Sequence, residues 1–219
     1  MYNRGTDLYV TDSSGGGGET AVLSNANIKR PSDWSRDGRF LLYTEVDPKS
    51  GADIWYLENP LGKTGAGKPV RFLGTSATES QAQLSPDGRW VAYTSSESGT
   101  GEVYVRPFPL GSGQTKVSSH GGREPRWSQD GKEIYFRAGT GSRRQAMASS
   151  LRFGPAGTLE PGVPQLLFEW HGGSVVTPRN AFSYSPAPGG RFLVNVFADS
   201  APPTINLITN WQKLAPGGK

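Results

Sequence analysis

The chain repeats one short turn four times, and this repeat restricts the fold more than any other feature of the sequence. The turn reads WSRDGR at residues 34–39, LSPDGR at 84–89 and WSQDGK at 127–132, and an altered copy, YSPAPGGR, occupies 184–191. In the second copy Pro86 fixes φ at the second turn position, and Gly88 can adopt a positive φ. A turn of this kind commonly joins two antiparallel strands. The repeat therefore predicts one hairpin unit used four times.

A strand of constant pattern follows each turn. Counted from the last glycine of the turn, the first residue is basic, the third is aliphatic, and the fifth is aromatic in the first three copies. Third and fifth residues share one face of a strand, so we expect them in the core. They are Leu41 and Tyr43, Val91 and Tyr93, Ile134 and Phe136, and in the fourth copy Leu193 and Asn195. This face is thus apolar in three copies and half apolar in the fourth.

Two further segments of strand character complete each unit. One has an acidic, an aliphatic and an aromatic residue in that order at 7–10, 53–56 and 102–105, with a looser copy at 204–207, and the third unit departs from the pattern at 145–148 (QAMA). The other lies at 20–23, 69–73, 115–118 and 165–168. Successive turn glycines are 50, 43 and 59 residues apart, close to the length of a four-stranded propeller blade. We therefore predict an all-β fold, a β-propeller of four-stranded antiparallel blades, with loop insertions at 138–144 and 153–163.

The number of strands decides whether such a ring can close. The sequence predicts 17 strands, or four to five blades, in a single domain over residues 1–219 with blade turns near 37–38, 87–88, 130–131 and 189–190. An N-terminal strand could complete the last blade. Otherwise the chain is a fragment or a shortened relative of a six- or seven-bladed propeller. Unpaired strand edges favour association, so a partial ring would favour a homodimer.

Composition excludes several classes of function. The chain has no cysteine, which excludes disulfides and thiol chemistry. It has no run of the roughly 18 apolar residues that a membrane-spanning helix needs. The formal net charge is +4, but the basic residues are scattered along the chain, so we expect no nucleic-acid partner.

Three segments resemble a known family. The turn at 85–89 (SPDGR), the following strand at 90–93 (WVAY) and the strand at 102–105 (EVYV) resemble TolB-type, WD-repeat-like β-propellers. The stretch 79–136 is similar to the C-terminal propellers of some bacterial serine/threonine kinases, and so is the segment 205–211 (INLITNW). The resemblance implies a scaffold, a sensor or a platform for partner proteins in a larger signalling or envelope protein. It also favours a periplasmic or extracytoplasmic location.

The candidate binding residues lie where the last strand of one unit connects to the first strand of the next. Loops of this kind converge on the channel of a propeller, where ligands commonly bind. Four residues before each turn copy stand Arg30, Ser80, Arg123 and Asn180, and the next position holds Gln81 and Glu124 in the second and third copies. Arg179 adjoins this set. We expect a polar, somewhat basic channel mouth that binds an acidic peptide or a carboxylate.

A catalytic alternative stays open, either a propeller hydrolase or lyase or the propeller domain of a prolyl-oligopeptidase-like peptidase. The sequence has no Gly-x-Ser-x-Gly elbow, so we favour a non-catalytic module that binds protein or peptide. The aspartates of the turn copies occupy identical positions and are interpreted as turn formers. His120 and His171 each precede a Gly-Gly pair and are interpreted as polar turn residues. We expect no metal site and no cofactor.

Three of the six tryptophans stand at two positions of the repeat. Trp34 and Trp127 occupy the same position of the repeat, which favours packing between blades. Trp90 shares its position with Phe40 and Glu133. Because a glutamate at this position suggests solvent access, we expect Trp90 at the surface as a contact residue.

Overall fold

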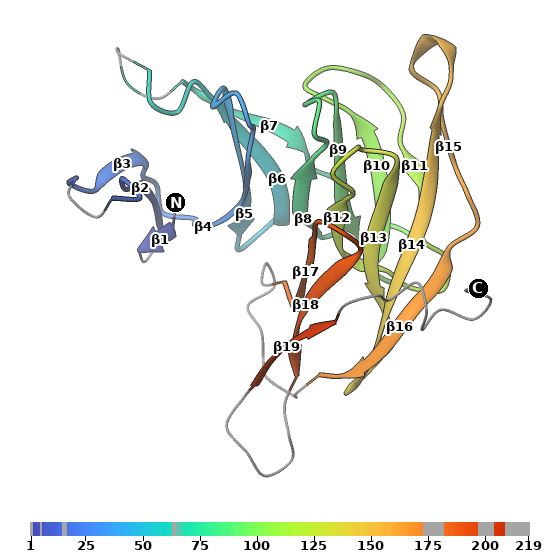
Figure 1. The fold of residues 1–219 in the computed structure, drawn as a ribbon. Coiled ribbons are helices and arrows are strands. Elements are labelled where there is room, and N and C mark those ends of the chain that lie inside the picture. The colour runs from blue at the N-terminus through green and yellow to red at the C-terminus, as the bar shows by residue number, and fades with distance from the viewer. Residues whose placement is uncertain are drawn as a thin grey trace.

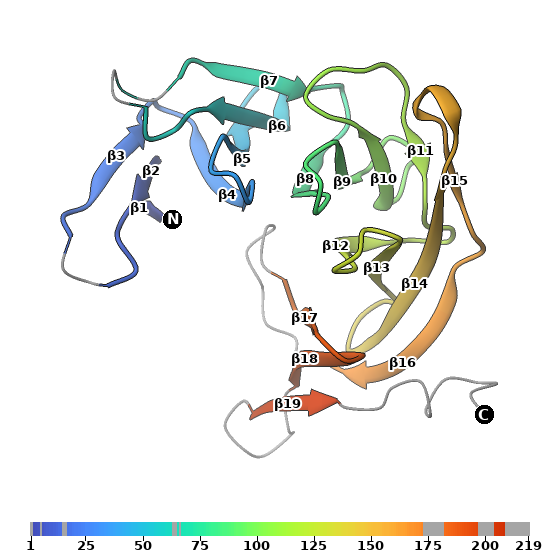
Figure 2. The ribbon, with the colours of Figure 1, turned by 45° about the horizontal axis from the view of Figure 1, so that its top comes forward.

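Five antiparallel sheets surround a common axis in the computed structural model (Figures 1 and 2). The structure describes residues 2–4, 6–14, 17–62, 65, 67–172, 182–196 and 204–208. The sheets are called blades 1 to 5 in chain order. Within the described residues the one helical element is a 3₁₀ turn, Pro155–Gly157. The predicted all-β propeller of antiparallel blades is confirmed.

The strands follow one another in a regular order within the blades. Blade 1 holds β1 (Tyr2–Arg4), β2 (Asp7–Val10) and β3 (Thr20–Leu23), and blade 2 holds β4 (Ile28–Trp34), β5 (Phe40–Asp47), β6 (Gly51–Glu58) and β7 (Pro69–Leu73). Blade 3 holds β8 (Glu79–Leu84), β9 (Trp90–Ser95), β10 (Glu102–Pro107) and β11 (Thr115–Lys116). Blade 4 holds β12 (Arg123–Trp127), β13 (Glu133–Ala138), β14 (Arg143–Phe153), β15 (Leu159–Pro161) and β16 (Gln165–His171). Blade 5 holds β17 (Tyr184–Ala187), β18 (Arg191–Val196) and β19 (Thr204–Ile208). The first strands of blades 2 to 5 lie nearest the axis (Figure 2).

Hydrogen bonds within the repeated turn explain its composition. The Ser85 hydroxyl donates to the Asp87 carboxylate at 2.6 Å and accepts the Trp90 N–H at 3.0 Å. Asp87 in turn accepts the Arg89 N–H at 3.1 Å. Gly88 has a φ of 70°, a conformation that side chains rarely adopt. The same bonds recur at Ser35–Asp37 and Ser128–Asp130, so the aspartates are turn formers as expected.

The hydrophobic core lies between neighbouring blades. On β5, Leu41 and Tyr43 pack toward blade 1, whereas Phe40 and Leu42 pack toward blade 3. The predicted core face is confirmed in the first three copies, because its residues are at most 1% exposed: Leu41, Tyr43, Val91, Tyr93, Ile134 and Phe136. Both faces of a central blade are therefore apolar, since each covers a neighbour.

The fourth copy differs from the prediction by one residue. Phe192 and Val194 are buried against blade 4, whereas Leu193 is 42% exposed and Asn195 is exposed. The longer turn pairs Tyr184 with Val194, while the equivalent Leu84 pairs with Val91. A register change of one residue turns every side chain to the opposite face of a strand. The prediction that Leu193 and Asn195 face the core is therefore wrong.

Two further predictions need correction. Trp90 is not a surface residue: it is 8% exposed and packs beside Phe153 at 5.3 Å between ring centroids. The segment 153–163 is not only a loop, because it contains β15, which pairs with the end of β14. A long β14 explains both observations, since its far end extends over blade 3 and is held in place by β15.

The five blades form an open arc in Figure 2, with β1–β3 at one end and β17–β19 at the other. The described residues contain 19 strands rather than 17, because β1 and β15 add to the predicted set. In the described part of the chain the N-terminal strands form a sheet of their own and do not complete blade 5.

Candidate functional site

A cavity of about 250 Å³ lies near the axis, at the hairpin ends of the innermost strands. We call it the axial pocket. Four blades contribute to it at related positions, chiefly through Asp33, Trp34, Gln83, Arg126, Trp127 and Pro186. Because the innermost strands converge around the axis (Figure 2), side chains near their ends meet here although they are far apart in sequence.

Arg126 places a positive charge in the wall of the axial pocket. Its Nη1 donates to Gln83 Oε1 at 2.7 Å, and its guanidinium lies 3.6 Å from the centre of the Phe182 ring. Its Nε is buried and has no hydrogen-bond partner among the described residues. Burial lowers the pKa of Arg126, but an arginine remains charged in a protein. The guanidinium therefore retains donor capacity for an anion.

Asp33 stands close to this cation but is already engaged. Its two carboxylate oxygens accept the backbone N–H groups of Trp34 at 2.9 Å and of Leu84, in the next blade, at 2.8 Å. Burial raises the pKa of the Asp33 carboxyl, and these hydrogen bonds and the charge of Arg126 act against the shift. Asp33 thus joins blades 2 and 3. Its negative charge also offsets the positive charge of Arg126, although the two side chains form no direct ion pair.

Gln83 and Trp127 continue the connection between blades. The Gln83 side chain donates to the Ser32 carbonyl in blade 2 at 2.9 Å while it accepts from Arg126 in blade 4. The Trp127 indole N–H donates to the Gln83 carbonyl at 2.9 Å. Trp34 and Trp127 pack against the cores between blades, as expected, and they also line the axial pocket.

Three of the predicted site residues are buried, and two of them, Gln81 and Glu124, bond to a neighbouring blade. Ser80, Gln81 and Glu124 are 6%, 5% and 3% exposed. Gln81 Oε1 accepts the Glu124 N–H at 3.0 Å, so the structure brings these two residues together. Both have a positive φ, at the bulges where the innermost strands of blades 3 and 4 bend.

Glu124 is the centre of a hydrogen-bond network that joins blades 4 and 5. One carboxylate oxygen accepts from Arg137 Nε at 2.7 Å, and the other accepts from both the backbone N–H and the hydroxyl of Ser183 at 2.7 Å. Its carbonyl accepts from the Tyr184 hydroxyl at 2.8 Å. These contacts hold blade 5 against blade 4.

The remaining predicted residues lie at the opposite end of the blades from the axial pocket or outside the description. Arg30 is half-buried and Arg123 is exposed. Arg179 and Asn180 lie outside the described residues. Ligand binding at this predicted mouth therefore stays a prediction.

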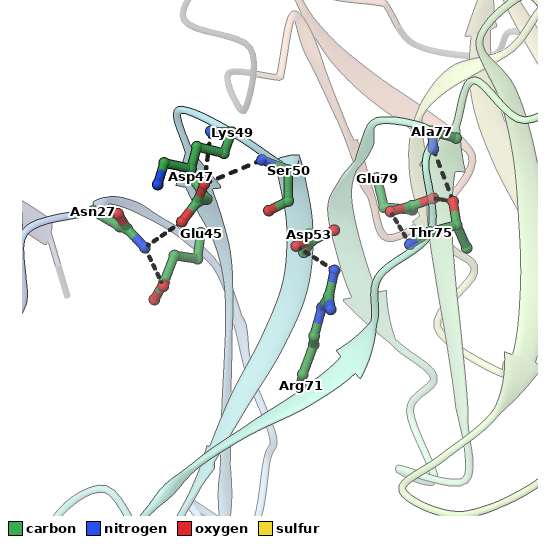
Figure 3. A network of polar contacts seen from close by, with 10 residues as sticks. All are labelled: Asn27, Glu45, Asp47, Lys49, Ser50, Asp53, Arg71, Thr75, Ala77 and Glu79. Carbon is green, nitrogen blue, oxygen red and sulfur yellow. Dashed lines mark hydrogen bonds and ion pairs between the residues drawn. The ribbon is translucent and has the colours of Figure 1, made fainter.

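Carboxylates are prominent at this same end of blades 2 and 3 (Figure 3). Asp53 accepts from Arg71 at 2.8 Å, and Glu79 accepts from the Thr75 hydroxyl at 2.5 Å. Glu45 accepts from Asn27 at 2.8 Å. The carboxylates shown in Figure 3 thus bond to neighbouring side chains and backbone.

No group of three His, Cys, Asp or Glu residues that could hold a metal ion occurs in the described part of the chain. His120 lies in a turn with a φ of 66°, whereas His171 ends β16 and pairs with Arg143 instead of occupying a turn. Among the described segments, no helix is both long and apolar enough to span a membrane.

Asp33, Gln83 and Arg126 were not among the predicted site residues, although the sequence holds a signal for them. Each stands directly before the first residue of a turn copy. At this position the repeat has an acidic, an amide or a basic side chain. The position that follows it, by contrast, holds a large apolar residue in each copy. Variable polar side chains at one repeat position near the axis are typical of a binding surface.

Comparison with known proteins shows that the fold is a β-propeller. No protein-family model and no curated protein sequence matches the chain. TolB from Acinetobacter baumannii has a similar structure, with a TM-score of 0.65 at 18% identity over 93% of this chain and 46% of TolB. A puromycin-hydrolyzing peptidase from Mycobacterium tuberculosis gives a TM-score of 0.64 at 15% identity over 94% of this chain and 34% of the peptidase. The chain spans less than half the length of either protein, and it shares the β-propeller fold with both.

Proposed function

We propose that this chain is a non-catalytic propeller module that binds a protein or peptide, and that the axial pocket binds a carboxylate of that partner. The observation that carries the proposal is Arg126. Its guanidinium lines the pocket, and within the described residues it donates one hydrogen bond, from Nη1 to Gln83 Oε1, so its other Nη donors are left for a ligand. A guanidinium recognises a carboxylate through parallel N–H bonds, so an acidic side chain or a free C-terminus suits this position.

The surroundings of Arg126 support an anionic ligand. Asp33 contributes negative charge, but both of its oxygens accept backbone N–H groups, which leaves the guanidinium without a bidentate partner. The Phe182 ring and the Gln83 amide hold the guanidinium in one orientation. A preorganised group loses less entropy when a ligand binds.

Capture by a peptide array tests this proposal. The purified chain is applied to immobilised short Gly/Ser peptides that carry an Asp, an Asn or a free C-terminus. We expect retention of the carboxylate peptides, and we expect Arg126→Gln to raise their Kd by roughly 10- to 100-fold, the loss of a charge-assisted hydrogen bond. Arg126→Lys keeps the charge without the planar fork and should give an intermediate Kd.

The matched controls are Arg30→Gln and Arg123→Gln, which remove the same charge at the opposite end of the blades. Unfolding curves of all variants show whether each remains folded. Equal binding by wild type and Arg126→Gln would exclude the axial pocket. Loss of binding in the two controls alone would instead support the channel mouth that the sequence predicts.

The propeller domain of a peptidase is the second candidate function. The structural similarity to the puromycin-hydrolyzing peptidase favours it. Faster hydrolysis of puromycin or of aminoacyl p-nitroanilides when the purified chain is mixed with a separately produced peptidase catalytic domain would support this candidate over a binding module.

A further inference from the structure

A second cavity opens between the hairpins of blades 4 and 5. Its volume is about 640 Å³, and we call it the interblade cavity. It shares Arg36, Trp127 and Pro186 with the axial pocket, so the two cavities adjoin, and we call them together the groove. Its size lies within the range of cavities that hold ligands.

The cavity exists because one repeat position changes from aromatic to acidic. Phe40 of blade 2 fills the space beside blade 3 and lies 5.0 Å from Phe108 between ring centroids. At the same position Trp90 of blade 3 fills the space beside blade 4, near Phe153. Blade 4 has Glu133 here, and Glu133 lines the interblade cavity. The space that an aromatic ring fills between the other blades is therefore open beside blade 5.

The walls of the cavity combine aromatic rings with carboxylates. Glu133 is half-buried and accepts from the Tyr135 hydroxyl at 2.9 Å. Tyr135 packs edge-on against Phe192 at 5.2 Å between ring centroids, and Trp127 forms another part of the wall. Aromatic faces and carboxylates both attract the ammonium of lysine and the guanidinium of arginine.

Charge along the groove changes sign. Arg126 lies in the axial pocket, whereas Glu133 and Asp130 line the outer part, against the single cation Arg36. Asp130 Oδ1 accepts from Ser128 and from the Lys132 N–H in its turn, and Glu133 Oε2 accepts from Tyr135. The second oxygen of each carboxylate accepts no hydrogen bond within the described residues, so it can accept from a ligand. A bound segment would therefore match the groove with an acidic group at the axis and a basic side chain farther out.

We propose that the interblade cavity binds a lysine or arginine side chain of the peptide whose carboxylate binds at Arg126. This inference rests on the proposed function, because it assigns a second subsite to the same partner. The ligand class is an extended peptide that carries both charges.

Fluorescein-labelled Gly/Ser peptides test the proposal. Each peptide carries one Asp and one Lys at a defined spacing. A matched second peptide has Gln in place of the Lys. Fluorescence anisotropy gives Kd for wild type, Glu133→Gln and the control Glu160→Gln, which removes the same charge at the one exposed residue of β15. We expect the Lys→Gln exchange in the peptide to raise Kd by about tenfold for wild type and for the control at the best spacing. Glu133→Gln should bind both peptides alike.

A second variant tests the shape of the cavity. Glu133→Phe introduces the aromatic residue found at this position in blade 2 and should fill the cavity. The Lys peptide should then lose its advantage, while the unfolding midpoint is not lowered.

The outcomes separate the two proposals. If Arg126→Gln weakens the Asp peptides but their Kd is the same with or without Lys, the cavity proposal is overturned and the axial function stands. If Glu133→Gln weakens binding of the Lys peptides but Arg126→Gln does not, the cavity is supported as a cation subsite and the axial function is overturned. Binding of neither peptide overturns both.

Discussion

Glu79 is fully buried, and its ionisation opposes folding. Burial raises the pKa of its carboxyl, the Thr75 hydrogen bonds act against the shift, and the charges of Asp53 and Glu97 add to it. Between the ordinary and the raised pKa the folded chain binds more protons than the unfolded chain, so the free energy of unfolding falls as pH rises through this window.

Replacement of that carboxyl by an amide should remove this dependence. We expect the free energy of unfolding of Glu79→Gln to fall less than that of wild type as pH rises from about 4 to about 7. Urea unfolding at a series of pH values measures the difference, with Glu160→Gln as the exposed control. Parallel curves for wild type and Glu79→Gln would contradict the assignment.

At the scale of one strand, β18 allows a direct test of register. Val194 is 1% exposed and Leu193 is 42% exposed. Val194→Ala should therefore lower the free energy of unfolding by about 2 kcal/mol, and Leu193→Ala by less than about 1 kcal/mol, although the leucine loses more atoms. Urea unfolding of the two variants decides the matter. A larger loss for Leu193→Ala would restore the register that the sequence predicts.

At the scale of two blades, Glu124 controls the attachment of blade 5. Glu124→Ala leaves the guanidinium of Arg137, 18% exposed, without its partner, and should cost about 3 kcal/mol. Ser183→Ala removes one hydroxyl bond to the same carboxylate and should cost about 1 kcal/mol. Hydrogen exchange should accelerate in β17 and β18 for both variants, while β9 stays protected. Equal acceleration in β9 would show global destabilisation instead.

The repeat shows why some elements were predictable and others were not. The first three hairpins could be predicted because serine, aspartate and glycine each make a bond or a φ that the turn needs, all within six residues. The fourth turn is longer, and pairing rather than sequence spacing sets its register, so Leu193 was placed on the wrong face. Arg126 and Asp33 could not be recognised as neighbours, because their proximity depends on how complete blades are arranged around the axis.

At the scale of the whole molecule, the blades end in an open arc (Figure 2). In the described part of the chain β19 is the last strand of its sheet and pairs only with β18. A strand edge of this kind presents backbone donors and acceptors that a second chain can pair with. We therefore expect reversible association of two chains through the outer edge of blade 5.

Light scattering coupled to size-exclusion chromatography measures this association. As concentration rises, the mass should approach twice the 23.5 kDa of one chain. Asn206→Pro removes one backbone donor from β19 without a change in charge. Successive N–H groups of a strand point to opposite sides, so one of two neighbouring residues donates toward the free edge and the other toward β18. If the Asn206 N–H points toward the free edge, Asn206→Pro should remain a monomer. If it points toward β18, Leu207→Pro should remain a monomer instead. A mass of one chain for wild type at every concentration would exclude the dimer, and a stable dimer in both proline variants would place the interface elsewhere on the arc.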